Sequence, residues 1–253
     1  MNSDMNSEII IEVEGLYKTY PGAAQPAVNG ISLAIHRESF FGLLGPNGAG
    51  KTTFLSMLTG LLKPDSGRIG VAGLDIMDNL NEIKHRLSFV PQDTALYPTL
   101  TARENLSFFG SMQGLSGSYL RLRVEVCLTI SDLNNFADSR VETFSGGMKR
   151  RLSLVIGLIH KPDILFLDEP TAGIDPQSRH FIYNTLRKMN AEGMTIVYTS
   201  HYMEEAEVLC DYIAIIDHGS VIAQGETGHL LSQHGAANLE QLFLALTGTR
   251  IRE

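Results

Sequence analysis

The chain has 253 residues, of which 43% are hydrophobic and 19% charged, which is typical of a globular protein with a substantial core. Its net charge of −8 and pI near 5.5 do not favour a nucleic-acid partner, and we predict none. The two cysteines, Cys127 and Cys210, are far apart and match no zinc-binding spacing, so we expect two buried thiols.

No segment predicts a signal peptide or a membrane span. Residues 1–8 are polar and lack a basic start and an apolar core, and apolar runs such as 164–167 are too short to cross a bilayer. We therefore expect a cytoplasmic chain whose membrane association depends on a partner.

The first predicted elements are strands, followed by one helix. Alternating or continuous apolar residues predict strands over 9–13, 31–35 and Phe40–Leu44. Helical spacing over 53–62 ends before Pro64. This first part of the chain predicts an N-terminal β subdomain joined to the core.

The middle of the chain predicts helices, and α/β alternation returns after it. The predicted elements, in order, are helices over 104–112, 120–130 and 147–159, buried strands over 164–167 and 195–198, a hairpin of 212–216 with 220–224, and an amphipathic helix over 239–246. These elements predict a single domain over 1–253, with a helical subdomain over 93–160 and a C-terminal helical extension over 226–253. The predicted fold class is α/β.

One loop fits the pattern G-x-x-x-x-G-K-[ST] without deviation, between an apolar strand and a helix. Glycines let successive backbone N–H groups turn toward phosphate oxygens, and the following helix adds its positive end. Lys51 is predicted to reach the β- and γ-phosphates and Thr52 to ligate Mg²⁺. The core is therefore predicted to be that of a P-loop NTPase. The predicted phosphate-binding residues are Gly45, Pro46, Asn47, Gly48, Ala49, Gly50, Lys51, Thr52 and Thr53.

An apolar strand over 164–167 ends in two carboxylates, Asp168 and Glu169. Carboxyl ends of parallel strands are where α/β sheets bind ligands. We expect Asp168 to hold Mg²⁺ through water and Glu169 to polarise the attacking water as general base. A solvated turn is the alternative for such a pair, and the upstream P-loop makes it the weaker one.

The run Phe144-Ser145-Gly146-Gly147-Met148-Lys149-Arg150 resembles the signature of ATP-binding cassette (ABC) proteins, whose usual form is L-S-G-G-Q. Ser145, Gly146 and Gly147 at a helix start make a second anion site, although Ser-Gly-Gly is also a common helix start. The resemblance implies that this site caps the γ-phosphate held by the opposite subunit. Met148 replaces the usual glutamine and cannot donate a hydrogen bond, but we still expect a working site.

Further elements of that family follow in order, and the resemblance covers residues 9–248. It implies that Gln92 contacts Mg²⁺ or water, that Asp175 crosses the dimer interface, and that His201 touches the γ-phosphate. Tyr20 resembles the aromatic residue that stacks on adenine. Tyr17 is the alternative, and we favour Tyr20.

The form Ser-Gly-Gly-Met-Lys-Arg-Arg resembles the ATPases of ABC-2-type exporters, as do residues 202–207 and the closing segment 239–248. For that last segment, a plain amphipathic helix packed on the core is the other explanation, and the two are compatible. The resemblance implies an ATPase that uses ATP and Mg²⁺, a second copy of the chain as a homodimer partner, and a separate permease at the inner face of the cell membrane. The permease is expected to dock near residues 93–98, with Leu96 and Tyr97 either as apolar anchors or packed internally.

Three other cassette classes are weaker interpretations. Sugar-importer ATPases have a C-terminal regulatory domain, whereas only a short segment follows Gly225. Translation-type cassette proteins have two tandem cassettes, whereas this sequence has one P-loop. DNA-maintenance ATPases divide their halves with a coiled coil or zinc modules, which are absent here. The sequence therefore favours the motor subunit of an exporter.

Overall fold

The computed structural model describes residues 8–248. The interpretation of residues 1–7 and the last part of the predicted C-terminal extension, residues 249–253, lie outside the described residues. The strands are β1 (Ile9–Lys18), β2 (Val28–His36), β3 (Phe40–Leu44), β4 (Ser66–Val71), β5 (Leu74–Asp75), β6 (Leu87–Val90), β7 (Ile164–Asp168), β8 (Thr195–Ser200), β9 (Tyr212–Asp217) and β10 (Ser220–Glu226). The helices are α1 (Lys51–Leu58), α2 (Ile76–Ile83), α3 (Ala102–Met112), α4 (Gly117–Ile130), α5 (Gly146–Gly157), α6 (Pro176–Ala191), α7 (Met203–Leu209), α8 (Thr227–His234) and α9 (Leu239–Thr247).

The central sheet has the strand order β10-β9-β3-β8-β7-β6, in which all neighbours pair in parallel except β10 with β9. Every residue of β3, β7 and β8 is buried, which explains their continuous apolar sequence, because parallel strands are covered on both faces. The carboxyl ends of β3, β6, β7 and β8 meet at one edge of this sheet. Ligands of α/β proteins bind at that edge.

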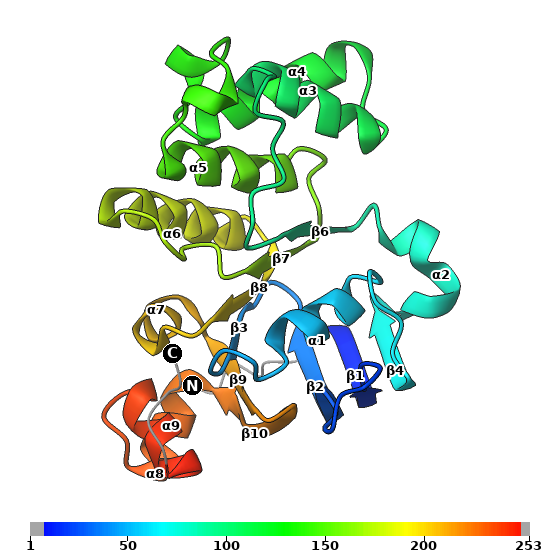
Figure 1. Cartoon of the computed structure of the whole chain (residues 1–253), viewed down its shortest axis with the longest axis vertical. Helices are drawn as coiled ribbons and strands as arrows, with labels where there is room; N and C mark the ends of the chain where they lie inside the picture. The colour runs from blue at the N-terminus through cyan, green and yellow to red at the C-terminus, as the bar shows by residue number, and fades with distance from the viewer. Residues whose placement is uncertain (1–7, 249–253) are drawn as a thin grey trace.

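A second, antiparallel sheet has the order β2-β1-β4-β5. Its buried residues form one core cluster with α1 and with one face of the central sheet. Figure 1 shows β1, β2 and β4 beside α1, below the central strands. This arrangement confirms the predicted N-terminal β subdomain.

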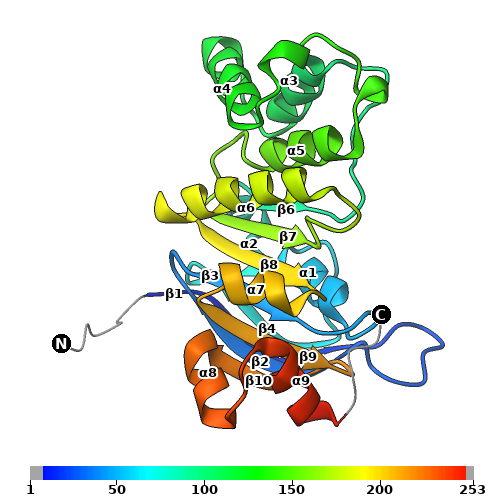
Figure 2. The ribbon, with the colours of Figure 1, turned by 90° about the vertical axis from the view of Figure 1, so that its left-hand side faces the viewer.

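Helices α3, α4 and α5 lie between β6 and β7 in the sequence. In both views α3 and α4 lie at the end of the molecule farthest from α8 and α9, while α5 and α6 lie between them and the sheet (Figures 1 and 2). The predicted α/β core with a helical insertion is therefore confirmed, whereas the boundaries 93 and 160 remain predictions. No helix in the described range 8–248 is long and apolar enough to cross a membrane.

The structure corrects several element predictions. The helix predicted over 53–62 runs from Lys51 to Leu58, because Gly50 adopts φ 103° as its N-cap and lets the helix begin directly. No element was predicted between residues 62 and 93, although β4, β5, α2 and β6 lie there. β4 contains Gly67 and Gly70, which have low strand propensity, and β6 is only four residues long, so neither shows a clear alternation.

Candidate active site

The P-loop after β3 curls around a cavity of about 210 Å³. A Cβ atom on Gly50 would lie 2.1 Å from the carbonyl oxygen of Ala27, so only glycine fits this turn. No side chain caps the start of α1, which leaves its first backbone N–H groups to an anion. The lining consists of Ala27, Asn47, Gly48, Ala49, Gly50, Lys51, Thr52, Thr53, Gln92 and Glu169.

Lys51 places a buried cation against this cavity. Its Nζ donates to the carbonyl oxygens of Gly45 at 2.8 Å and Pro46 at 3.1 Å, and lies 3.4 Å from Oε1 of Glu169. Burial lowers the pKa of Lys51, and the nearby carboxylate of Glu169 opposes that shift. The ammonium group is thus held between carbonyl and carboxylate oxygens, which are the kind of partner that a phosphate would replace.

Asp168 links the P-loop with the neighbouring strand β8. Its Oδ2 accepts from the hydroxyl of Thr52 at 2.9 Å, and its Oδ1 accepts from the hydroxyl of Thr199 at 2.7 Å. Hydroxyl and carboxylate oxygens are the ligands that Mg²⁺ prefers in nucleotide sites. The pair of Thr52 and Asp168 therefore fits the predicted magnesium ligands.

Glu169 is held in an uncommon conformation. It is nearly buried and adopts φ 44°, a left-handed conformation that costs a non-glycine residue about 1–2 kcal/mol and is typical of functional sites. Its N–H donates to Thr199 Oγ1 at 3.0 Å, and its Oε2 lies 2.9 Å from Nδ1 of His201. The strained turn thus points the carboxylate at both Lys51 and His201.

Gln92 and Tyr20 are two further predicted residues near the cavity. Gln92 follows β6 and lines the cavity. The hydroxyl of Tyr20 lies 3.3 Å from Oγ1 of Thr53, while the hydroxyl of Tyr17 lies over Gly30. The geometry therefore favours Tyr20 over Tyr17 as the base-stacking residue. We call the set beside the cavity the cavity half-site: Tyr20, Lys51, Thr52, Gln92, Asp168, Glu169 and His201.

Some predicted residues contact the cavity lining without being part of it: Tyr20, Gly45, Pro46, Asp168 and His201. The remaining predicted residues form a separate group. Ser145 is the N-cap of α5 and accepts from the N–H of Met148 at 3.2 Å. Asp175 is the N-cap of α6, and the backbone N–H of Ser178 lowers the pKa of its carboxyl group by hydrogen bonding. A Cβ atom on Gly147 would lie 2.0 Å from Oγ of Ser178, so glycine permits the close approach of these two helix starts.

Both views show α5 and α6 next to each other and apart from α1 (Figures 1 and 2). Ser145, Gly146 and Asp175 are exposed. We call this second group the exposed half-site: Ser145, Gly146, Gly147 and Asp175. Within one chain, the structure does not bring the two half-sites together.

The two departures from the usual signature have structural explanations. Phe144 is buried, with its ring 6.3 Å from that of Phe136, so it fills an apolar position. Met148 is partly buried and packs against the core cluster that includes α5. Its side chain therefore serves packing, while the backbone of the exposed half-site is unaffected.

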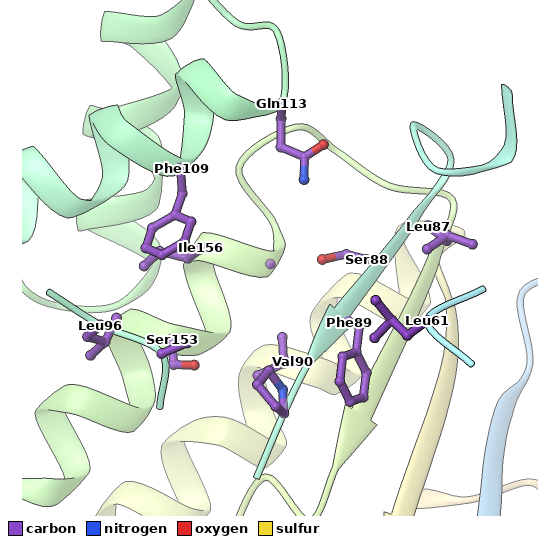
Figure 3. A pocket seen from close by; sticks show the side chains of 13 residues that line it. Leu61, Leu87, Ser88, Phe89, Val90, Leu96, Phe109, Gln113, Ser153 and Ile156 are labelled. Carbon is purple, nitrogen blue, oxygen red and sulfur yellow. The ribbon is translucent and has the colours of Figure 1, made fainter. Parts of the chain in front are cut away.

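An apolar groove lies between β6 and the helical insertion, with a volume of about 300 Å³. Figure 3 shows Phe109 from α3 and Ile156 from α5 facing Phe89 and Val90 of β6 across it. Leu96 lines the groove and packs against the core, as the interpretation of internal packing expects, while its role as a docking anchor stays a prediction. Tyr97 is 45% exposed, and its ring meets that of Phe108 edge to face at 4.9 Å, beside the groove.

Sequence reasoning missed two residues that contact the predicted site. Thr199 bridges Asp168 and Glu169, and its position two residues before His201 at a strand end was an available signal. Arg150 is buried on α5 and donates to backbone carbonyls on both sides of the site. No sequence pattern indicated these contacts, because the acceptors are backbone carbonyls and every residue has one.

A sequence profile described as ABC transporter matches residues 28–172, which is more than half of the chain. The chain belongs to the ABC transporter family. It is 48% identical to a linearmycin resistance ATP-binding protein of Bacillus subtilis (strain 168) over 93% of this chain and 75% of that protein. It is 43% identical to a Nod factor export ATP-binding protein of Ralstonia nicotianae over 94% of this chain and 74% of that protein.

A solved structure agrees with the assignment to the ABC family. It is a dimeric ATP-binding cassette in a post-hydrolysis state bound to ADP and Pi, 28% identical, with a TM-score of 0.78 over 85% of this chain and 98% of that chain. The chain thus has the P-loop NTPase fold of an ABC ATPase and is the ATP-binding, ATP-hydrolysing subunit of a transporter. Both buried cysteines are also as expected.

Proposed function

We propose that this ABC ATPase powers an exporter by closing and reopening a dimer around ATP. The observation that supports it most is the contact of Glu169 with both Lys51 and His201, because a carboxylate beside the phosphate loop is suited to act as a general base. The relatives named for Nod factor export and linearmycin resistance favour export over an importer or a non-transport role.

ATP binding is assigned to the cavity half-site. Tyr20 stacks on adenine, and backbone N–H groups of residues 47–53 surround the phosphates. Lys51 exchanges the carbonyl oxygens of Gly45 and Pro46 for phosphate oxygens, so its buried charge keeps oxygen partners throughout.

Thr52 and Asp168 are proposed to hold Mg²⁺, with Gln92 as a further oxygen ligand. The hydroxyl oxygen of Thr52 and Oδ2 of Asp168 lie 2.9 Å apart beside the cavity. When bound, the ion neutralises negative charge on the phosphate oxygens.

Hydrolysis is assigned to Glu169 with His201 and Gln92. Glu169 accepts a proton from the attacking water, and Gln92 helps to orient that water. Because Nδ1 of His201 faces Glu169, Nε2 is the ring nitrogen that remains to contact the γ-phosphate. His201 therefore orients the base and stabilises the charge of the transition state.

The exposed half-site is proposed to complete the site of a second copy. Ser145, Gly146 and Gly147 at the start of α5 cap the γ-phosphate bound by the partner, and Asp175 crosses the interface. Closure then excludes bulk water from the reacting groups. One chain contains both half-sites, which supports a homodimer.

The permease is proposed to dock an apolar helix in the groove between β6 and α5, with Leu96 and Tyr97 at its margin. This contact would hold the chain at the inner face of the cell membrane. Movement of the helical insertion would then couple nucleotide occupancy to the permease.

The substitution Glu169→Gln tests the proposed clamp. It keeps the size and hydrogen-bonding capacity of the side chain but removes the basic carboxylate, so hydrolysis should fall by about 10²–10⁴-fold. Binding should survive, because Lys51, Thr52 and Asp168 are unchanged. With Mg-ATP, light scattering should show the mass doubling from the 27.8 kDa of one chain, since a ligand that binds only the dimer favours it.

The matched control is Asp217→Asn, an equivalent loss of one carboxylate at the end of β9 outside the cavity lining. This variant should hydrolyse ATP and show no trapped dimer. A Glu169→Gln chain that binds ATP tightly, does not hydrolyse it and stays monomeric would contradict the clamp.

A further inference from the structure

Arg150 on α5 has an unusual set of partners. All five of its N–H donors are used, and every acceptor is a backbone carbonyl rather than a carboxylate. Nη1 donates to the carbonyl oxygens of Pro91 at 2.7 Å and Gln92 at 2.8 Å. Nη2 donates to those of Asp168 at 3.2 Å and Glu169 at 3.0 Å. Nε donates to that of Pro170 at 2.5 Å.

These carbonyls belong to two neighbouring strand ends. β6 pairs in parallel with β7, with Val90 opposite Leu167, and the acceptors begin directly after those residues. One group of acceptors includes the backbone of Gln92. The other includes Glu169, whose left-handed φ of 44° needs support from its surroundings. A single guanidinium group therefore joins both catalytic turns.

The guanidinium group is fixed in place. Arg150 is 4% exposed, and burial lowers its pKa to about 10, so it stays protonated at neutral pH. A buried charge is costly unless its donors are satisfied, and here carbonyl dipoles satisfy all of them. Any shift of α5 would thus either move the two turns or break these hydrogen bonds.

The same helix begins at the exposed half-site. Ser145 caps α5 only five positions before Arg150, a rise of roughly 7.5 Å along one rigid helix. We propose that Arg150 is a positioning residue that makes the geometry of Glu169 and Gln92 depend on the position of α5, so that contacts made by Ser145 control hydrolysis. This inference rests on the roles assigned to those residues under the proposed function.

Arg123 provides a matched control. It is 6% exposed, and it also donates to carbonyl oxygens, at 2.8 Å to both Leu158 and Ile159. Those acceptors lie at the far end of α5 and outside the cavity lining. Arg123 and Arg150 thus share burial and bonding type and differ in what they hold.

The test compares Arg150→Lys with Arg123→Lys in the full chain. A lysine keeps the charge but has three donors on one atom, so it cannot serve both turns. In Arg150→Lys, kcat should fall by about 10²-fold, the scale of a misplaced reacting group, while KM for ATP stays within about threefold. In Arg123→Lys, kcat should stay within about twofold of wild type.

Hydrogen exchange provides a readout that does not require turnover. Arg150→Lys should speed amide exchange selectively in residues 91–95 and 168–172, and Arg123→Lys at the end of α5. Uniform loss of protection over the chain, a parallel loss of ATP binding, or an unchanged kcat would overturn the proposal. A Glu169→Gln chain that binds Mg-ATP but fails to dimerise would instead count against the proposed clamp, because the exchange pattern is independent of it.

Discussion

The two half-sites are built in opposite ways. In the cavity half-site, charged groups contact one another: Lys51, Glu169 and His201 are joined over distances of 2.9–3.4 Å and are largely buried. In the exposed half-site, the polar groups lie at helix starts, where Ser145 and Asp175 accept from backbone N–H groups of their own helices. The first is preorganised within one chain, whereas the second offers donors that a partner must use.

This difference predicts which measurements respond to which residues. Substitutions in the cavity half-site should change ATP binding by a single chain, or the chemical step once the dimer has closed. Substitutions in the exposed half-site should leave single-chain binding intact and affect only the closed dimer.

Lys51→Ala should have the largest effect on binding. It removes a buried cation beside Glu169 and the phosphate loop, and losing one member of a buried charge pair costs about 3–5 kcal/mol. ATP affinity measured by calorimetry should therefore fall by roughly 10²-fold or more. Affinity within a few-fold of wild type would show that the P-loop does not bind the phosphates as assigned.

Ser145→Arg should separate binding from hydrolysis. Arginine would fill the anion site at the start of α5, so hydrolysis should drop by about 10²-fold, the scale of losing a transition-state donor. Single-chain ATP affinity should not change, and the dimer trapped by Glu169→Gln should disappear. Ser116→Arg is the matched control, because Ser116 is also an exposed helix N-cap. If Ser116→Arg blocks the dimer equally, added charge rather than the site is responsible.

Tyr20→Ala should weaken ATP binding by about 1–3 kcal/mol, the range for one base–aromatic stack. Tyr17→Ala should do less, because Tyr17 lies over Gly30 while Tyr20 reaches Thr53 of the P-loop. Both rings are similarly exposed, so the pair differs mainly in position. Competition with ADP in a fluorescence assay would measure both, and a larger loss at Tyr17 would reverse the assignment.

The sequence was sufficient for the parts of the site that depend on local pattern. The apolar runs of β3, β7 and β8 located the strand ends, and the residues at these ends form most of the cavity half-site, whereas Tyr20 and Gln92 follow β1 and β6. The predicted start of α5, residue 147, lies one residue from the observed start at Gly146, because serine is a strong helix N-cap and Ser145 precedes this helix. These patterns are local, so they can be recognised without knowledge of tertiary contacts.

Other features required the structure. The left-handed conformation of Glu169 depends on Thr199 and on carbonyl contacts from Arg150, which lie in separate segments. Strand β4 was missed because its two glycines have low strand propensity, and its place in the sheet depends on pairing with β1, a distant segment of the chain. Contacts of this kind have no periodicity in the chain and appear only once the sheets are assembled.

Met148→Gln should have the smallest effect. The change restores the residue usual in this family, and glutamine has the same unbranched length as methionine. Met148 packs at the edge of the core, and its N–H, not its side chain, contacts Ser145. We therefore expect an ATPase rate within about threefold of wild type.

Leu152→Gln is the contrast on the same helix. Leu152 is fully buried, so a polar side chain there should lower the free energy of unfolding by about 1–3 kcal/mol. A collapse in activity for Met148→Gln without a loss of stability would show that the exposed half-site depends on this side chain. The separation between the two half-sites would then hold, but backbone donors alone would not account for the second one.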